Sequence, residues 1–220
     1  MQLPFATVAT LARLAKKYQF EAILDEGLKR IKSCFTDSLK AYDMVDRRKG
    51  SDLMTFVESD AIAAVAIARL TNTPSILPLA LYNCCQLDPV VITSGIVRAN
   101  GIVDRLSSAD RLGCLRARTI LCNATHVAAH NILKPTCQHA YHACVCVRAI
   151  KAVSQELWRY EGSRLAHYRA LQNWDDIIDR VAGHCCQSCI TLLKTRAAEE
   201  RRTVWAKLPT IFGVPYTLAA

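Results

Sequence analysis

The sequence predicts an all-α protein, an irregular multi-helix bundle of six to eight helices. Gly and Pro are sparse, at 8 and 7 of 220 residues, whereas a turn-rich β fold needs both in quantity. Apolar residues recur at helical spacing in several segments, and no segment carries a strand pattern of comparable strength. Hydrophobic residues make up 51% and charged residues 21%, which is ordinary globular usage and suffices for one or two domains with a sizeable core.

Two helices are expected near the N-terminus, over 8–18 and 20–35. The second places six apolar side chains at helical spacing on one face: Phe20, Ile23, Leu24, Leu28, Ile31 and Phe35. Segment 37–50 is polar and has no clear period, so a loop is expected there.

The middle of the chain predicts buried helices. Ser59 is a candidate N-cap ahead of "DAIAAVAIARL", a helix so apolar on every side that it belongs inside the bundle. Thr73 and Pro74 are placed to begin the next helix, which Pro78 would kink or delay. The uncharged run 70–87 is long enough to span a membrane, but its prolines and polar residues favour a buried helix with its loop. No membrane partner is therefore expected.

Longer helices follow. Asn100–Gly101 is a strong turn signal, and Ser107 with Asp110 resembles a capping box that opens a helix reaching to about Leu133. Pro135 stops that helix, and another is expected over 141–157. A further helical segment is capped by Asn173, breaks near Gly183 and ends before Pro209.

The formal net charge is +9, and residues 111–160 hold seven Lys and Arg against one acidic residue. A nucleic-acid-associated basic helical protein is the alternative function, because cations that neutralise phosphates release counterions. These charges lie singly between apolar residues, with no aromatic platform interleaved in the sequence. We therefore favour a solvated face and do not expect a nucleic-acid partner.

Eleven cysteines could form a disulfide framework, a metal site or part of the core. The N-terminus lacks the basic start of a signal peptide, so we expect an intracellular protein, cytoplasmic or nuclear, whose thiols stay reduced. An odd cysteine count also disfavours disulfides. Five cysteines sit among apolar residues and are expected in the core: Cys34, Cys84, Cys85, Cys114 and Cys122.

Four other cysteines have spacings that suit a zinc site: Cys137, Cys144, Cys186 and Cys189. The last two lie at i and i+3, on one helical face, and the first two straddle a predicted helix start. Zinc binds four such sulfurs at about 2.3 Å, which sets neighbouring sulfurs roughly 3.8 Å apart. Core packing remains the other interpretation, and five residues could substitute as ligands: Cys146, Cys185, His139, His142 and His184.

No catalytic constellation is apparent, so the chain is not expected to be an enzyme. No glycine-rich phosphate loop occurs, and no orienting third residue or oxyanion signature supports a Cys–His nucleophile. Asp175 and Asp176 fall in the first turn of a predicted helix, where the helix dipole accounts for their charge.

Several stretches resemble one protein family. "LARLAKKYQFEAILDEGLKRIKSCF" resembles the helices that close the BTB domain in BTB domain-containing proteins of basidiomycete fungi, and "SDAIAAVAIARLTNTPSILPLALYNCCQL" resembles the helical region after it. Cys137, Cys144 and "CCQSCITLLKTRAAEERRTVWAKLPTIFGV" are similar to the family's C-terminal stretch. The resemblance implies three regions: closing helices over 1–36, a central helical region over 37–135 and a cysteine-containing region over 136–220.

The resemblance also carries expectations about function. It implies zinc at Cys137, Cys144, Cys186 and Cys189, and a non-enzymatic protein–protein interaction module with an unknown protein partner. The chain begins at the closing helices, as a truncated BTB protein would. BTB-type dimerisation and docking to a cullin-type ubiquitin-ligase scaffold are therefore not expected.

Overall fold

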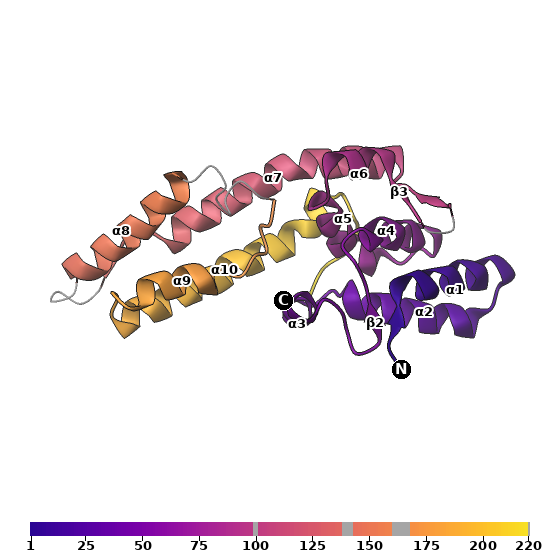
Figure 1. Ribbon diagram of the computed structural model, residues 1–220, viewed down its shortest axis with the longest axis horizontal. Coiled ribbons are helices and arrows are strands. Elements are labelled where there is room, and N and C mark those ends of the chain that lie inside the picture. The colour runs from indigo at the N-terminus through magenta and orange to yellow at the C-terminus, as the bar shows by residue number, and fades with distance from the viewer. Residues whose placement is uncertain (99–100, 138–142, 160–167, 220) are drawn as a thin grey trace. The chain divides into compact units, whose positions relative to one another are not determined.

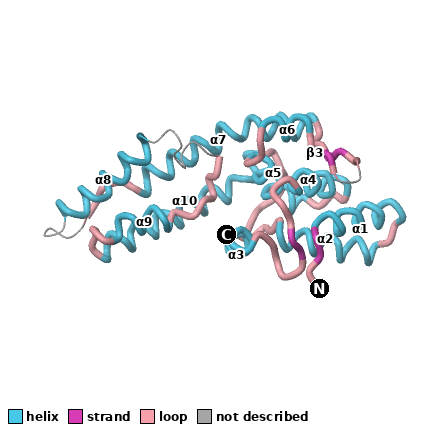
Figure 2. The backbone as a smooth tube through the Cα atoms, viewed as in Figure 1, coloured by secondary structure: helices cyan, strands magenta, loops and turns pink. Residues whose placement is uncertain are grey.

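The computed structural model describes residues 1–98, 101–137, 143–159 and 168–219, and it confirms the all-α fold (Figures 1 and 2). Ten α-helices, one 3₁₀ helix and four two-residue strands occur within these ranges. The two helices beyond the predicted number are short, α3 (Leu39–Arg48) and α6 (Pro89–Ser94).

The chain divides into two compact units. The first comprises Met1–Ala117 with Ala206–Ala220, and the second comprises Arg118–Trp205. The three-region division over 1–36, 37–135 and 136–220 remains a prediction.

The first unit contains most of the elements. Its other helices are α1 (Phe5–Tyr18), α2 (Glu21–Cys34), α4 (Asp60–Leu70), the 3₁₀ helix Pro74–Ile76 and α5 (Leu77–Cys85). Its strands are β1 (Leu3–Pro4), β2 (Met54–Thr55), β3 (Ile96–Val97) and β4 (Val103–Asp104), with β1 and β2 parallel and β3 and β4 antiparallel. The second unit contains α8 (Ala143–Arg159) and α9 (Asp175–Ala182), and the unit boundaries fall within α7 (Ser108–Ile132) and α10 (Gln187–Ile211).

Helices α1 and α2 form a close antiparallel hairpin. Gln19 takes the left-handed conformation that ends α1, and its amide donates to the Ala15 carbonyl. Gly27 faces Ala12 so closely that an added Cβ would lie 3.3 Å from the Ala12 Cβ. Small residues at this crossing let the two backbones approach.

Helix α4 is buried on nearly every side, as its composition predicts. Ser59 occupies the N-cap position, but its side chain makes no capping hydrogen bond; the Asp60 carboxylate instead accepts from the Val57 amide. Pro74 opens a 3₁₀ turn rather than an α-helix, and α5 begins with Pro78 in its first turn. The predicted delay is therefore present.

The loop predicted over 37–50 is wrong, because α3 occupies most of it. Leu39 and Val45 are buried, and this pair is enough to hold a short helix against the unit. Lys49 adopts φ 52° and its amide donates to the Val45 carbonyl, so the helix ends without the glycine that usually marks such a stop.

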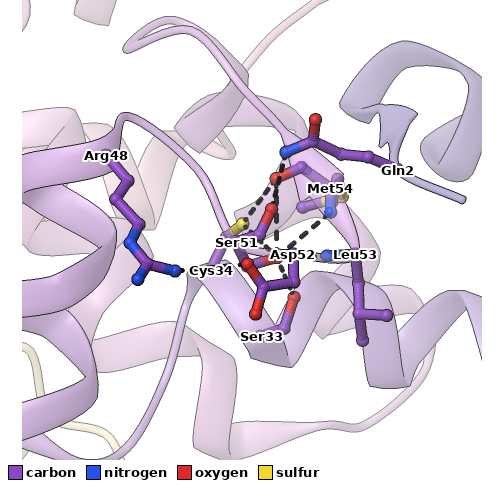
Figure 3. Close-up of polar contacts among 8 residues, drawn as sticks. All are labelled: Gln2, Ser33, Cys34, Arg48, Ser51, Asp52, Leu53 and Met54. Atoms are coloured by element: carbon purple, nitrogen blue, oxygen red, sulfur yellow. Dashed lines mark hydrogen bonds and ion pairs between the residues drawn. The ribbon is translucent and has the colours of Figure 1, made fainter.

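The turn after α3 is organised by one hydroxyl. Ser51 Oγ accepts from the amides of Leu53 at 3.2 Å and Met54 at 3.1 Å, and lies 2.6 Å from Ser33 Oγ (Figure 3). The Cys34 thiol donates to the Met54 carbonyl at 3.4 Å, and burial raises its pKa. Cys34 is thus a core thiol, as predicted.

A chain of buried ion pairs joins α1, α4 and the β3–β4 hairpin. Arg98 donates to Asp60 and to Asp104, each at 2.6 Å, and Arg13 donates to Asp104 at 2.7 Å. The two carboxylates are only 6% exposed, so each depends on these partners. The predicted Ser107–Asp110 cap is also present, since the Asp110 amide donates to Ser107 Oγ.

The core of the second unit is contributed by α7, α8, α9 and α10. Its buried members are Ala128, Ala129, Ile132, Leu133, Ile150, Val153, Leu157, Trp174, Ile177, Ile178, Val181, Leu193 and Ala197. The predicted break near Gly183 is present, because α9 ends at Ala182 and α10 begins at Gln187.

The expectation that the last helix ends before Pro209 is wrong, because α10 continues to Ile211. Pro209 lies in the final turn, where its ring removes one hydrogen bond without interrupting a longer helix. The amides of Phe212 and Val214 then bond to the Leu208 and Pro209 carbonyls, which satisfies the helix end. None of the described helices combines the length and apolar character needed to cross a membrane.

Candidate metal centre

Four thiols of the second unit converge at one point. They belong to Cys137, Cys146, Cys186 and Cys189, and their sulfur atoms all lie within 4.8 Å of one another. Cys137 lies in the segment after α7, and Cys146 is in the first turn of α8. Cys186 immediately precedes α10, and Cys189 is in its first turn. This arrangement could hold a metal ion.

Three of the four predicted ligands are in this cluster. The fourth, Cys144, lies in α8 but its side chain is outside the described part of the structure, so its ligand role stays a prediction. Cys146, considered as a substitute, supplies the fourth described thiol. A sequence signal for it exists: Cys146, Ile150, Val153 and Leu157 follow one helical stripe, and all four are buried.

The spacing of the sulfurs suits a single ion. Cys137 Sγ and Cys186 Sγ are 4.0 Å apart, close to the roughly 3.8 Å expected between two sulfurs that share a tetrahedral zinc ion. Cys146 is 1% exposed and Cys189 is 3% exposed, whereas Cys137 and Cys186 are only partly buried. The site therefore lies at the edge of the core, with two ligands on the inner side.

Backbone and side-chain contacts fix these thiols in place. The Cys186 amide donates to Cys146 Sγ at 3.3 Å, which links the start of α10 to α8. The Cys189 thiol donates to the Thr136 carbonyl at 3.5 Å. Arg196, two turns along α10, donates to the Lys134 carbonyl at 2.9 Å and to Thr136 Oγ1 at 3.0 Å. The segment that carries Cys137 is thus held before any metal binds.

The pKa values of Cys186 and Cys189 are shifted in opposite directions. Hydrogen bonding from the Cys189 backbone lowers the pKa of Cys186, which also sits at the positive N-terminal end of α10. Burial raises the pKa of Cys189 well above its ordinary value. Four thiolates at such distances would repel one another strongly, so a divalent cation is the natural partner of the deprotonated set.

The other candidate ligands are placed differently. Cys185 Sγ donates to the Cys146 carbonyl at 3.9 Å and packs against the core, and burial raises its pKa to about 11. His184 is exposed and is not a member of the cluster. His139 and His142 lie outside the described residues.

The remaining described cysteines lie within the first unit or on α7. Cys34, Cys84, Cys85 and Cys114 are fully buried, as predicted for core residues, whereas Cys122 is only partly buried. The core assignment was therefore too strong for Cys122.

Comparison with protein-family models, with curated proteins and with solved structures found no match to this chain. The metal centre therefore has to be interpreted from its own geometry.

Proposed function

We propose that this chain is a non-enzymatic helical module for protein–protein contact, whose second unit is held together by a structural zinc ion. The observation that carries the proposal is the closed set of four thiols at Cys137, Cys146, Cys186 and Cys189. Structural zinc sites have four protein ligands, whereas catalytic zinc sites keep one position open for water or substrate. Four protein sulfurs leave no such position.

Zinc is the metal that this donor set favours. Thiolate ligands select soft or borderline metals over magnesium and calcium, and four sulfurs in a tetrahedron suit zinc or iron–sulfur chemistry. The sulfurs are close enough to share one ion, and zinc accepts this geometry without redox chemistry.

A zinc ion here would join three separate parts of the chain. Cys137 precedes α8, Cys146 lies within it, and Cys186 and Cys189 begin α10. Closing these segments around one ion restricts the unfolded chain and fixes the α9–α10 turn. The bound ion would thereby rigidify the second unit, while contact with a protein partner is assigned to a surface of the first unit.

The first unit offers an exposed apolar surface for such a contact. We define the α1–α2 patch as Leu11, Leu14, Tyr18, Phe20 and Ile23, each between 42% and 58% exposed. Leu11, Leu14 and Tyr18 share one face of α1, and the rings of Tyr18 and Phe20 are 6.5 Å apart. Exposed apolar groups gathered in this way are typical of surfaces that bind another protein. The sequence resemblance to the region following a fungal BTB domain is consistent with a contact role.

Native mass spectrometry of the purified full chain tests the metal part of the proposal. We expect one zinc ion per chain, lost on chelation and recovered on adding zinc. Cys186→Ser should abolish the zinc adduct, whereas the neighbouring Cys185→Ser should retain it, because Cys185 Sγ bonds to the Cys146 carbonyl and is not one of the four clustered sulfurs. Full zinc occupancy in Cys186→Ser, or none in the wild-type chain, would contradict the site.

The contact role is tested separately with the α1–α2 patch. A partner recovered by affinity capture should bind the wild-type chain and be lost with Leu14→Glu/Tyr18→Glu. Lys40→Glu, at an exposed position on α3, is the control for added negative charge. Equal capture by all three chains would remove the patch from the proposal while leaving the zinc result intact.

A further inference from the structure

The outer face of α8 gathers cations around an aromatic ring. We define the α8 basic face as Arg148, Lys151, Gln155, Trp158 and Arg159, all of which are exposed. Their spacing places them on one side of the helix, opposite the buried stripe Cys146–Ile150–Val153–Leu157. From Arg148 to Arg159 the face extends about 16 Å along the axis.

Trp158 is the unusual member of this face. Its side chain is 52% exposed, whereas the chain's two other tryptophans, Trp174 and Trp205, are each 1% exposed. The His126 ring on α7 lies 5.4 Å from the Trp158 ring and supports it from one side. An indole held by a neighbouring ring offers a preformed platform for stacking.

Few acidic residues accompany these cations in the sequence. Between Arg118 and Arg159 the described sequence contains one carboxylate, Glu156, and it pairs with Arg180 of α9. Lys134 and His130, both exposed, extend the basic character from α8 towards the end of α7. The positive excess therefore belongs to the stretch from Arg118 to Arg159, whereas α9 of the same unit carries the exposed Asp175, Asp176 and Asp179.

We propose that the α8 basic face binds single-stranded nucleic acid without strong sequence preference, as a function beyond the proposed contact role. Positive side chains that follow a backbone, together with an aromatic ring on which a base can stack, are the two parts of such a site. A docked amphipathic peptide would need a row of apolar residues, and Trp158 is the one large apolar member of this face. The sequence alone did not show this, because the cations and Trp158 meet only when α8 forms.

Fluorescence measurements on the full, zinc-loaded chain test the proposal. A 20-nucleotide oligo-dT or oligo-U strand should quench tryptophan emission, and because Trp174 and Trp205 are buried the quenching reports on Trp158. Binding should weaken steeply with salt. Arg148→Gln/Lys151→Gln/Arg159→Gln should reduce the slope of log K against log salt by about 2. Trp158→Ala lacks the reporting indole, so its affinity is measured by fluorescence anisotropy of a dye-labelled strand; it should bind about tenfold more weakly, as expected from the loss of one stacked base.

Lys16→Gln/Lys17→Gln/Lys29→Gln is the matched control, since it removes the same charge from exposed positions of the first unit. It should leave affinity within about twofold of the wild-type value at moderate salt. An equal loss in the control, or no quenching by either strand, would overturn the proposal. So would polyglutamate or anionic lipid vesicles competing as well as the oligonucleotide at equal charge, because neither supplies a base to stack.

Discussion

The two units of this protein are stabilised in different ways. Both units completely bury large apolar side chains, such as Phe5 and Ile62 in the first unit and Trp174, Trp205 and Ile178 in the second. The first unit also pairs its buried carboxylates with arginines. The second combines its apolar core with a four-thiol cluster at the edge of that core. The comparison indicates that a metal ion in the second unit would join segments distant in sequence, as the buried carboxylates and their arginines do in the first.

Chelation should have the largest effect, because it should destabilise the second unit and not the first. Structural zinc contributes roughly 10–16 kcal/mol in small zinc-dependent folds, so chelation should unfold most of the second unit and leave the first folded. Hydrogen exchange read by mass spectrometry should show α8 and α9 losing protection while α4 and α5 keep theirs. Equal loss of protection in both units would show that their stabilities are not separable in this way.

The reverse experiment removes a buried carboxylate from the first unit. Asp104→Asn removes the negative charge that Arg98 and Arg13 share but keeps one acceptor oxygen; breaking a buried ion pair costs about 3–5 kcal/mol, and the cost here should be lower because the Arg13 side chain is 36% exposed. Arg98 also has a buried Nη2 atom without a hydrogen-bond partner among the described residues, so its guanidinium is already incompletely paired in the folded state. Chemical denaturation should show a destabilised first unit, with zinc content unchanged.

Asp46→Asn is the control for that variant. Asp46 pairs with Lys49 at 3.1 Å, but both side chains are more than half exposed, so the change should stay within about 1 kcal/mol. If Asp46→Asn and Asp104→Asn destabilise the chain equally, burial does not determine how much an ion pair contributes to the free energy of unfolding.

The sequence predicted the parts of the fold that depend on strong local patterns. The α4 helix, the Ser107 cap and the break near Gly183 all follow from composition, capping or a single glycine. The α3 helix was missed because only Leu39 and Val45 mark it, and two buried residues give no measurable period. Pro209 was taken as a stop because the rule for proline does not say which turn it will occupy.

The candidate metal site was likewise predictable from local sequence patterns only in part. Cys186 and Cys189 were predictable from their i, i+3 spacing, and Cys137 from its place before a helix. Whether Cys146 faces inward depends on where α8 starts, which sequence methods place only to within a few residues. The apolar stripe through Ile150 and Val153 identifies Cys146 once α8 is known. Convergence of the four thiols comes from tertiary packing, which no local pattern encodes.

The smallest expected effect concerns the C-terminal segment of the first unit. Tyr216 Oη donates to Asp37 Oδ2 at 2.6 Å, and the Ala219 amide donates to the Asp37 carbonyl at 2.9 Å. Tyr216→Phe removes the first of these bonds and should cost about 1 kcal/mol. Tyr18→Phe, at an exposed position on α1, should leave stability unchanged and serves as the control.

The stability difference between the wild type and Tyr216→Phe should depend on pH, which gives a second test of the contact. Hydrogen bonding to Asp37 raises the pKa of Tyr216, so the folded state holds the phenolic proton more tightly than the unfolded state does. Its contribution is therefore complete below the unfolded pKa of about 10 and is lost as pH rises through the higher folded value. The stability gap between wild type and Tyr216→Phe should stay constant from pH 7 to 9 and close above pH 10. A gap that widened with pH would mean that the Asp37 contact does not depend on the tyrosine proton.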